Sequence, residues 1–247
     1  MHQQATPLIL CNVWDVASAK TAEKMGFSAI GTSSAAIASM LGYQDGEEML
    51  FEELLFIVKR IAACSKLPLT VDIEAGYSDD PLITANYIKA LTTVGVVGIN
   101  LEDSKVDSVR TLVDANKFAD YLSKIKQELR QQQIDIFINV RTDTFLLGEE
   151  NVLLATQKRM SLYQSAGADG LFVPCIIKVD DIQAVVNAIN LPVNVMCMPN
   201  LPDFDTLTTL GVKRISMGNF LFDKLQADFE DELKQILEKN SFLSVFS

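Results

Sequence analysis

The sequence predicts an α/β protein that folds as one (β/α)8 barrel of the TIM type over residues 1–247. Its length matches such a barrel, which takes about 250 residues. Short apolar runs alternate along the chain with segments of helical length and period. The runs are apolar nearly throughout, which is typical of parallel strands covered on both faces. An open, doubly wound sheet is less favoured because it usually carries a glycine-rich loop after its first strand, and here that turn reads Asn12-Val13-Trp14-Asp15.

Eight strand-like runs are expected, with helical segments between them. The expected strands span residues 8–14, 28–32, 69–74, 97–102, 134–141, 170–174, 193–197 and 214–217. A helical period marks residues 47–64, 81–94, 117–131, 152–166 and 180–189. At four junctions a glycine that can adopt the left-handed cap separates a helix from the next strand: Gly26, Gly95, Gly167 and Gly211.

The composition argues against several kinds of partner. A net charge of −11 and a pI of about 4.6 disfavour nucleic acid and anionic membrane surfaces. Every stretch of 18 residues contains charged or polar breaks, so we expect no membrane span. The N-terminus lacks the basic and apolar regions of a signal peptide, and we expect a cytoplasmic protein with reduced thiols.

The scarcity of histidine narrows the chemistry. His2 is the only histidine, and it stands at the N-terminus. A Ser-His-Asp triad, a Cys-His pair and a histidine metal site are therefore disfavoured. The four cysteines form no C-x-x-C pair of the kind found in zinc and redox sites. If the protein is an enzyme, its catalytic groups are therefore expected among carboxylates, Arg, Lys, Tyr, Ser, Cys or a hard metal ion.

Polar residues gather where the expected strands end, which is where a barrel of this type builds its active site. Three carboxylates stand at consecutive strand ends: Asp72, Glu74 and Glu102. Residues two apart in a strand share a face, so Asp72 and Glu74 are expected to point the same way. Clustered carboxylates repel one another unless a cation binds them, and oxygen ligands select Mg²⁺ or Mn²⁺. The alternative is that these acids cap the helices that follow.

Six motifs occur in an order that resembles the isocitrate lyase/phosphoenolpyruvate mutase superfamily. They extend over most of the chain, about residues 8–220. The motifs are Asn12-Val13-Trp14-Asp15, Gly31-Thr32-Ser33-Ser34-Ala35, Leu41-Gly42-Tyr43-Gln44-Asp45-Gly46-Glu47, Asp72-Ile73-Glu74-Ala75-Gly76-Tyr77, Gly98-Ile99-Asn100-Leu101-Glu102-Asp103 and Arg141-Thr142-Asp143.

The resemblance implies a barrel that binds Mg²⁺ (or Mn²⁺) and a small 2-oxo acid or its enolate. By position, Asp72 matches the principal metal carboxylate, and a mostly water-mediated shell is completed by Asp45, Glu74 and Glu102. Ser33 and the amides around Ser34 match the group that grips the substrate carboxylate. Arg141 matches the arginine that neutralises the oxyanion. The substrate-facing set expected here is Trp14, Ser33, Ser34, Asp45, Arg141 and Asn194.

Arg141 also has a structural explanation, as one half of a buried ion pair with Asp143 or Asp103. The candidate proton donors near the mouth are Tyr43 and Tyr77. Lys105 is a third candidate, but solvated surface charge is the more frequent role of lysine.

The departures from the superfamily concern the loop after the fourth strand. Members that cleave isocitrate or methylisocitrate carry a catalytic cysteine there, whereas residues 103–110 of this chain contain neither Cys nor His. The longer loop of the mutase and phosphonopyruvate hydrolase subgroups is also absent. The third-strand motif ends Gly76-Tyr77-Ser78 where Gly-Tyr-Gly is usual.

Three functions are consistent with the sequence. The first is a Mg²⁺-dependent lyase that breaks a C–C bond of a small 2-oxo or 2-hydroxy carboxylate, or decarboxylates it, through a metal-stabilised enolate. The second is a phosphonopyruvate or phosphoenolpyruvate mutase or hydrolase acting on a P–C bond. The third is a 2-oxo acid binding protein with little turnover.

The C-terminal segment is expected to mediate assembly. A helix over residues 219–239 carries an apolar stripe formed by Leu221, Leu225, Phe229, Leu233, Ile236 and Leu237. An apolar tail over residues 242–246 follows it. The resemblance implies that this last helix is exchanged between subunits, giving a homodimer or homotetramer. The alternative is that helix and tail fold back on their own barrel.

Overall fold

A computed structural model describes residues 1–246. Nine parallel strands form one sheet, in the order β1-β11-β10-β9-β8-β5-β4-β3-β2. Only Leu10 separates β1 from β2, and its amide also bonds to β11, so the two short strands act as one and the sheet closes into a barrel. The strands are β1 (Leu8–Ile9), β2 (Cys11–Val13), β3 (Ile30–Thr32), β4 (Leu69–Asp72), β5 (Val96–Glu102), β8 (Phe137–Arg141), β9 (Gly170–Val173), β10 (Val193–Met196) and β11 (Arg214–Ser216). The predicted barrel is confirmed.

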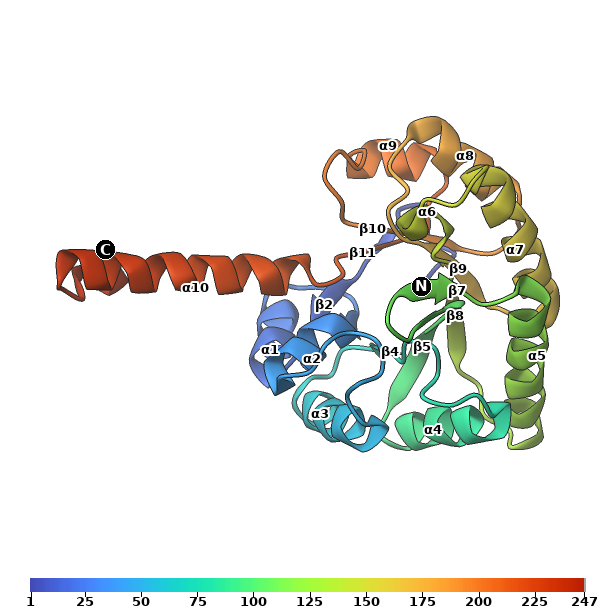
Figure 1. The fold of residues 1–247 in the computed structure, drawn as a ribbon, viewed down its shortest axis with the longest axis horizontal. Helices are drawn as coiled ribbons and strands as arrows, with labels where there is room; N and C mark the ends of the chain where they lie inside the picture. Colours follow the sequence, from blue (N-terminus) through green and yellow to red (C-terminus); the bar gives the residue numbers. More distant parts are fainter. Residues whose placement is uncertain (247) are drawn as a thin grey trace.

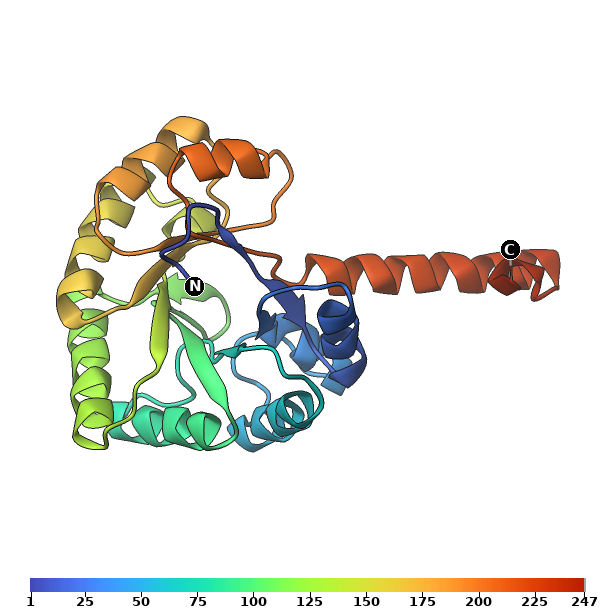
Figure 2. The ribbon, with the colours of Figure 1, turned by 180° about the vertical axis from the view of Figure 1, so that it is seen from behind.

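Helices surround the sheet, as Figures 1 and 2 show from opposite sides. At all four predicted junctions the glycine has a positive φ, as Gly95 (φ 95°) and Gly167 (φ 103°) illustrate. The helices are α1 (Val16–Lys24), α2 (Ser34–Leu41), α3 (Phe51–Cys64), α4 (Pro81–Thr93), α5 (Ala115–Gln131), α6 (Thr144–Leu147), α7 (Val152–Ala166), α8 (Val179–Asn187), α9 (Phe204–Thr209) and α10 (Phe220–Lys239), with a final 3-10 turn, η1 (Leu243–Phe246).

Acidic caps set where several helices begin. The Asp114 side chain accepts from the amides of Asn116 (3.1 Å) and Lys117 (3.0 Å), so α5 begins two residues before the predicted start. Asp80 caps α4 through the Leu82 amide at 2.9 Å. The expectation that a helix begins at Glu47 was wrong: Glu47 has φ 67°, and α3 begins at Phe51. Capping by acids is therefore real in this chain, but at positions outside the strand-end cluster.

The core has an apolar outer part and a polar inner part. Outward-facing residues of the strands, such as Val71 and Ile99, are fully buried against the helices. Inside the barrel, the Asn139 amide donates to Asn100 at 2.9 Å and to Asn194 at 3.1 Å. Asn194 in turn donates to Ser216 at 3.1 Å. Hydrogen bonds therefore hold the polar side chains in fixed orientations beneath the carboxyl ends of the strands.

A short antiparallel hairpin follows β5 and was not predicted. It pairs β6 (Ser104–Val106) with β7 (Arg110–Leu112), in the register Val106 opposite Arg110. This hairpin follows the fourth strand of the barrel, the place where the sequence lacks both the catalytic-cysteine loop and the longer mutase loop.

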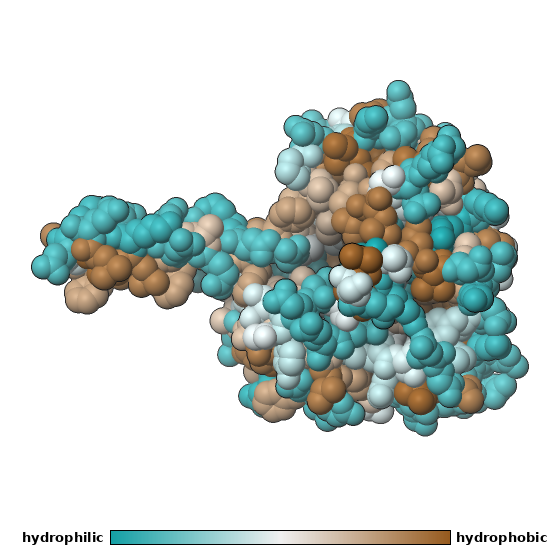
Figure 3. Space-filling view, viewed as in Figure 1, coloured by the Kyte–Doolittle hydropathy of each residue, from teal (hydrophilic) through white to brown (hydrophobic). Residues whose placement is uncertain are grey.

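Helix α10 projects away from the barrel (Figure 1), so the alternative in which it folds back on its own barrel is not what the structure shows. Phe222 anchors its first turn, with its ring 5.2 Å from the Trp14 ring. Farther out, the apolar stripe lies along one side of the helix in Figure 3 and is exposed, by 61% at Phe229 and 80% at Leu237. No helix within residues 1–246 combines the length and apolar character that spanning a bilayer requires.

Candidate active site

A cavity of about 410 Å³ lies at the carboxyl ends of the strands. Acidic, basic and small polar side chains meet in it, with a few apolar ones. Its lining residues are Asn12, Ser33, Ser34, Ala35, Asp45, Asp72, Asn100, Arg110, Arg141, Leu146, Phe172, Pro174, Met196, Ser216, Gly218 and Asn219. The carboxyl end of a barrel is where enzymes of this fold place their active sites.

Asp72 ends β4 and, among residues 1–246, is one of the two acidic residues that line the cavity, the other being Asp45. Its amide donates to the Thr32 hydroxyl at 2.9 Å, which ties β4 to β3. Its carboxylate accepts from the Glu74 amide at 3.2 Å. Burial raises the pKa of Asp72, while Arg141 opposes the shift. Burial therefore disfavours the charged form of this carboxyl group, and a nearby cation would favour it.

Glu74 lies just beyond β4, in the left-handed conformation (φ 51°). The expected alternation of strand side chains therefore does not apply to it, because β4 has already ended at Asp72. Its carboxylate accepts from the Glu47 amide at 2.8 Å. Burial, together with the charges of Asp45 and Asp72, raises the pKa of Glu74 to about 9.

Arg141 ends β8 and is engaged at all three guanidinium nitrogens. Nη1 pairs with Glu102 at 2.8 Å, while Nε and Nη2 bond to Asp143 at 2.6 and 3.0 Å. Burial lowers the pKa of Arg141, but the two carboxylates outweigh it and the net shift is upward. Arg141 thus belongs to a buried ion pair with Asp143, as one explanation proposed, and also lines the cavity.

Arg110 is a cavity residue that the sequence reasoning missed. The β6–β7 hairpin carries it inward, where Nη2 lies 2.9 Å from Asp45. Nη1 donates to Ser104 at 2.9 Å and to Asp143 at 3.3 Å, and it also pairs with Glu102. Neither composition nor spacing in residues 103–110 marks this arginine as pointing inward.

These arginines change the charge balance of the expected metal shell. Of its four carboxylates, Glu102 pairs with both arginines and Asp45 pairs with Arg110. Asp72 and Glu74 have no ion-pair partner among residues 1–246. In that part of the chain, no group of three His, Cys, Asp or Glu side chains is arranged to hold a metal ion. These four carboxylates therefore do not form an enclosing metal cage, and Asp72 is the one that lines the cavity without an ion-pair partner in residues 1–246, as suits an ion that keeps most of its waters.

The start of α2 supplies polar groups on another part of the wall. Ser33 is the N-cap, and its hydroxyl accepts from the Ala36 amide at 3.3 Å. The Ser34 hydroxyl donates to Asp45 at 3.5 Å. Unpaired amides and the positive end of the helix dipole make such a terminus suitable for a carboxylate.

The loops around the acidic residues adopt an uncommon backbone conformation. Glu47, Glu74 and Tyr77 all have positive φ, at 67°, 51° and 58°. The three are interlocked, since the Glu47 carboxylate accepts from the Tyr77 amide at 2.6 Å and its own amide donates to Glu74. Such residues persist only where the surroundings determine them, and they cluster at functional sites.

Comparison with known proteins identifies the family. The family model described as phosphoenolpyruvate phosphomutase matches residues 1–237. The chain belongs to this family. The resemblance to the isocitrate lyase/phosphoenolpyruvate mutase superfamily is thereby confirmed.

Three proteins with similar sequences or structures illustrate the range of related proteins. An uncharacterised Mycobacterium tuberculosis protein is 36% identical over 89% of this chain and 80% of its own length. The crystal structure of a candidate phosphonomutase from Burkholderia cenocepacia is 36% identical, covers 94% of this chain and 96% of that one, and has a TM-score of 0.88. An oxaloacetate decarboxylase of Pseudomonas entomophila is 27% identical over 84% of this chain and 72% of its own length.

Within this family member, the cavity brings together only part of the expected substrate-facing set. Ser33, Ser34, Asp45 and Arg141 line it. Asn194 is 1% exposed and belongs to the hydrogen-bonded layer inside the barrel.

The other expected contacts lie elsewhere. Trp14 lines a separate groove of about 560 Å³ between α1 and the base of α10. The Tyr43 hydroxyl donates to Glu53 of α3 at 3.1 Å. The Tyr77 hydroxyl donates to Glu74 at 3.5 Å, so it reaches the acidic cluster without lining the cavity.

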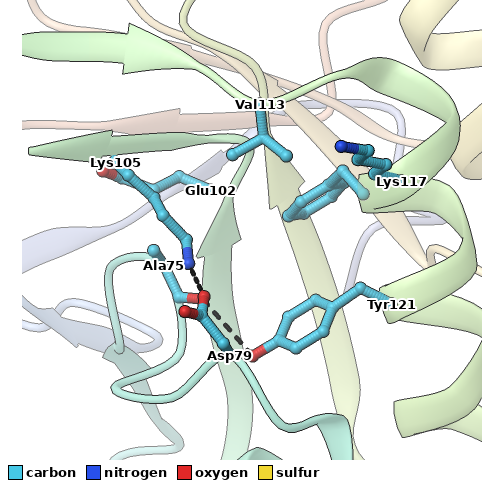
Figure 4. A pocket seen from close by; sticks show the side chains of 8 residues that line it. Ala75, Asp79, Glu102, Lys105, Val113, Lys117 and Tyr121 are labelled. Atoms are coloured by element: carbon cyan, nitrogen blue, oxygen red, sulfur yellow. Dashed lines mark hydrogen bonds and ion pairs between the residues drawn. The ribbon is translucent and has the colours of Figure 1, made fainter.

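A smaller pocket of about 250 Å³ lies beside the hairpin (Figure 4). Lys105 points into it and forms an ion pair with Asp79, and Tyr121 and Lys117 of α5 close the other side. Glu102 lines this pocket and also forms ion pairs with Arg110 and Arg141. Lys105 thus lies outside the main cavity.

Proposed function

We propose that this protein is a Mg²⁺-dependent lyase that breaks a carbon–carbon bond of a small 2-oxo or 2-hydroxy carboxylate, decarboxylation included. The observation that carries the proposal is the combination, in one cavity, of the Asp72 carboxylate, which forms no ion pair within residues 1–246, the guanidinium of Arg141 and the start of α2. The Pseudomonas relative, named as an oxaloacetate decarboxylase, supports it.

The residues of the cavity suit this reaction. The amides after Ser33 bind the substrate carboxylate, as expected of a helix start. Arg141, fixed by Glu102 and Asp143, places a positive charge in the cavity, and such a charge stabilises the oxygen on which negative charge develops when the bond beside a carbonyl breaks. A Mg²⁺ ion at Asp72, when bound, would supply further positive charge there.

A second candidate is P–C bond chemistry on phosphonopyruvate or phosphoenolpyruvate. The name of the matching family model and the 36% identical candidate phosphonomutase favour it. The short β6–β7 hairpin weighs against it, because the mutase loop expected at this position is absent.

A third candidate is a 2-oxo acid binding protein with little turnover. The cavity lining contains no Tyr, Cys, His or Lys within the residues that the structure describes, so the proposed donors Tyr43, Tyr77 and Lys105 do not face the ligand. Decarboxylation requires least from such a donor, because carbon dioxide leaves without a proton and the enolate that remains can take its proton from water.

Steady-state assays of oxaloacetate, phosphonopyruvate and methylisocitrate, each with Mg²⁺ and with a chelator, separate the three candidates. The lyase proposal predicts Mg²⁺-dependent turnover of oxaloacetate or methylisocitrate. Turnover of phosphonopyruvate alone would replace it with P–C chemistry. Binding of oxalate without turnover of any of the three compounds would support the third candidate, a 2-oxo acid binding protein with little turnover.

We further propose that the protein assembles as a homodimer or homotetramer through α10. The apolar side of this helix and the turn η1 are exposed, and the groove of about 560 Å³ at its base is lined by apolar groups, including Met25, Phe27 and Leu225. Exposed apolar surfaces of this kind mark interfaces.

A further inference from the structure

Arg110 and Arg141 line the same cavity but are held differently. The partners of Arg141, Glu102 and Asp143, are 4% and 0% exposed. Arg110 shares them through Nη1, but its Nη2 pairs with Asp45, whose side chain is 38% exposed. An ion pair with a solvent-accessible carboxylate contributes about 0–1 kcal/mol, so another carboxylate can replace Asp45 at low cost.

The hairpin presents this guanidinium from a defined place. Arg110 is the first residue of β7 and pairs with Val106 across the three-residue turn 107–109. Ser104 at the other end of β6 accepts from Nη1 at 2.9 Å. The side chain is only 16% exposed although it originates next to a surface turn. The hairpin therefore directs one cation into the cavity.

We propose that Arg110 is a specificity-determining residue that binds a second carboxylate, distal to the 2-oxo or 2-hydroxy acid group of the substrate. This inference rests on the proposed function. The first carboxylate is bound at the start of α2, and Arg110 stands on a different element of the same cavity. The planar guanidinium suits two-point binding of a carboxylate. The substrate class is thus a small dicarboxylate rather than a monocarboxylate.

Binding of two ligands that differ only at the distal position tests the inference. Malate carries a carboxylate where 2-hydroxybutyrate, of the same configuration, carries a methyl group. Dissociation constants of both are measured at saturating Mg²⁺ for the wild type, Arg110→Gln, Arg110→Lys and the surface control Lys117→Gln. We expect Arg110→Gln to weaken the binding of malate about tenfold or more, as loss of one charged hydrogen-bonding partner implies. The binding of 2-hydroxybutyrate should weaken less than about twofold.

The other variants and outcomes complete the test. Arg110→Lys should recover part of the malate affinity because it retains the charge, and Lys117→Gln should change neither ligand. The ratio of two affinities measured on one sample does not depend on its folded fraction, so partial unfolding cannot imitate the result. Equal losses for both ligands, or no loss for malate, would overturn the role of Arg110. If the wild type bound neither malate, 2-hydroxybutyrate nor oxalate, the proposed function itself would fail.

Discussion

Nη2 of Arg110 lies 2.9 Å from Oδ2 of Asp45, although 65 positions separate the two residues in the chain. This contact joins the β6–β7 hairpin to the loop after α2. Asp45 is one of the carboxylates that the family resemblance assigns to the metal shell, so the protein itself supplies a cation to that shell. Asp72 is left as the carboxylate with the clearest need for a metal ion.

Replacement of Asp72 by alanine should abolish Mg²⁺ binding and activity. The fold should survive, because the change removes a crowded negative charge and not an apolar core side chain; we expect the free energy of unfolding to change by less than about 2 kcal/mol. Titration calorimetry with Mg²⁺ and denaturant unfolding measure the two effects. Asp79→Ala, which removes an exposed carboxylate paired with Lys105, is the matched control. Unchanged Mg²⁺ affinity in Asp72→Ala would remove Asp72 from the metal site.

Replacement of Arg141 by lysine keeps the charge but loses the planar guanidinium. Binding of oxalate should weaken by about tenfold, the effect of losing one charge-assisted hydrogen bond, while Mg²⁺ affinity stays nearly constant. Calorimetric titrations of each ligand measure both quantities. Equal oxalate affinity in the variant and the wild type would leave Arg141 with only its structural pairing to Asp143.

Mg²⁺ binding should release protons at pH 7. Without the ion, burial and neighbouring carboxylates raise the pKa of Glu74 to about 9, so this group carries a proton at neutral pH. A nearby cation favours the charged form and lowers that pKa, which expels the proton. Calorimetry in two buffers of different ionisation enthalpy should show release of up to about one proton per ion, declining as the pH rises past about 9. Glu74→Gln should reduce the release, and an enthalpy independent of buffer would contradict the prediction.

The exposed side of α10 should hold subunits together. Light scattering at micromolar concentration should show a dimer or tetramer. A chain truncated after Asn219 should form assemblies of fewer subunits. Phe229→Asp places a charge on the apolar side and should dissociate the oligomer, whereas Asp231→Lys alters the charge of a residue that is exposed by 71% and should not. A 27 kDa wild-type monomer would refute the proposed assembly.

The barrel could be predicted because its signals are local. The apolar runs around Val71 and Ile99, and the glycines at the helix ends, mark strands and junctions from their own residue types. Asp72 and Arg141 were placed correctly at strand ends for the same reason. The inward position of Arg110 could not be predicted in this way, since it depends on a hairpin whose register brings residues from three separate segments together. Tyr43 illustrates the same limit, because its partner Glu53 belongs to a helix that begins later than its period suggested.

The central claim is that one cavity holds both a divalent ion and a 2-oxo acid, and a crystal structure with Mn²⁺ and oxalate tests it most directly. Mn²⁺ prefers the same oxygen ligands as Mg²⁺, and its anomalous scattering identifies it without ambiguity. We predict an anomalous peak beside the Asp72 carboxylate, with oxalate between the ion, Arg141 and the start of α2. Mn²⁺ bound elsewhere, or oxalate outside this cavity, would contradict the claim.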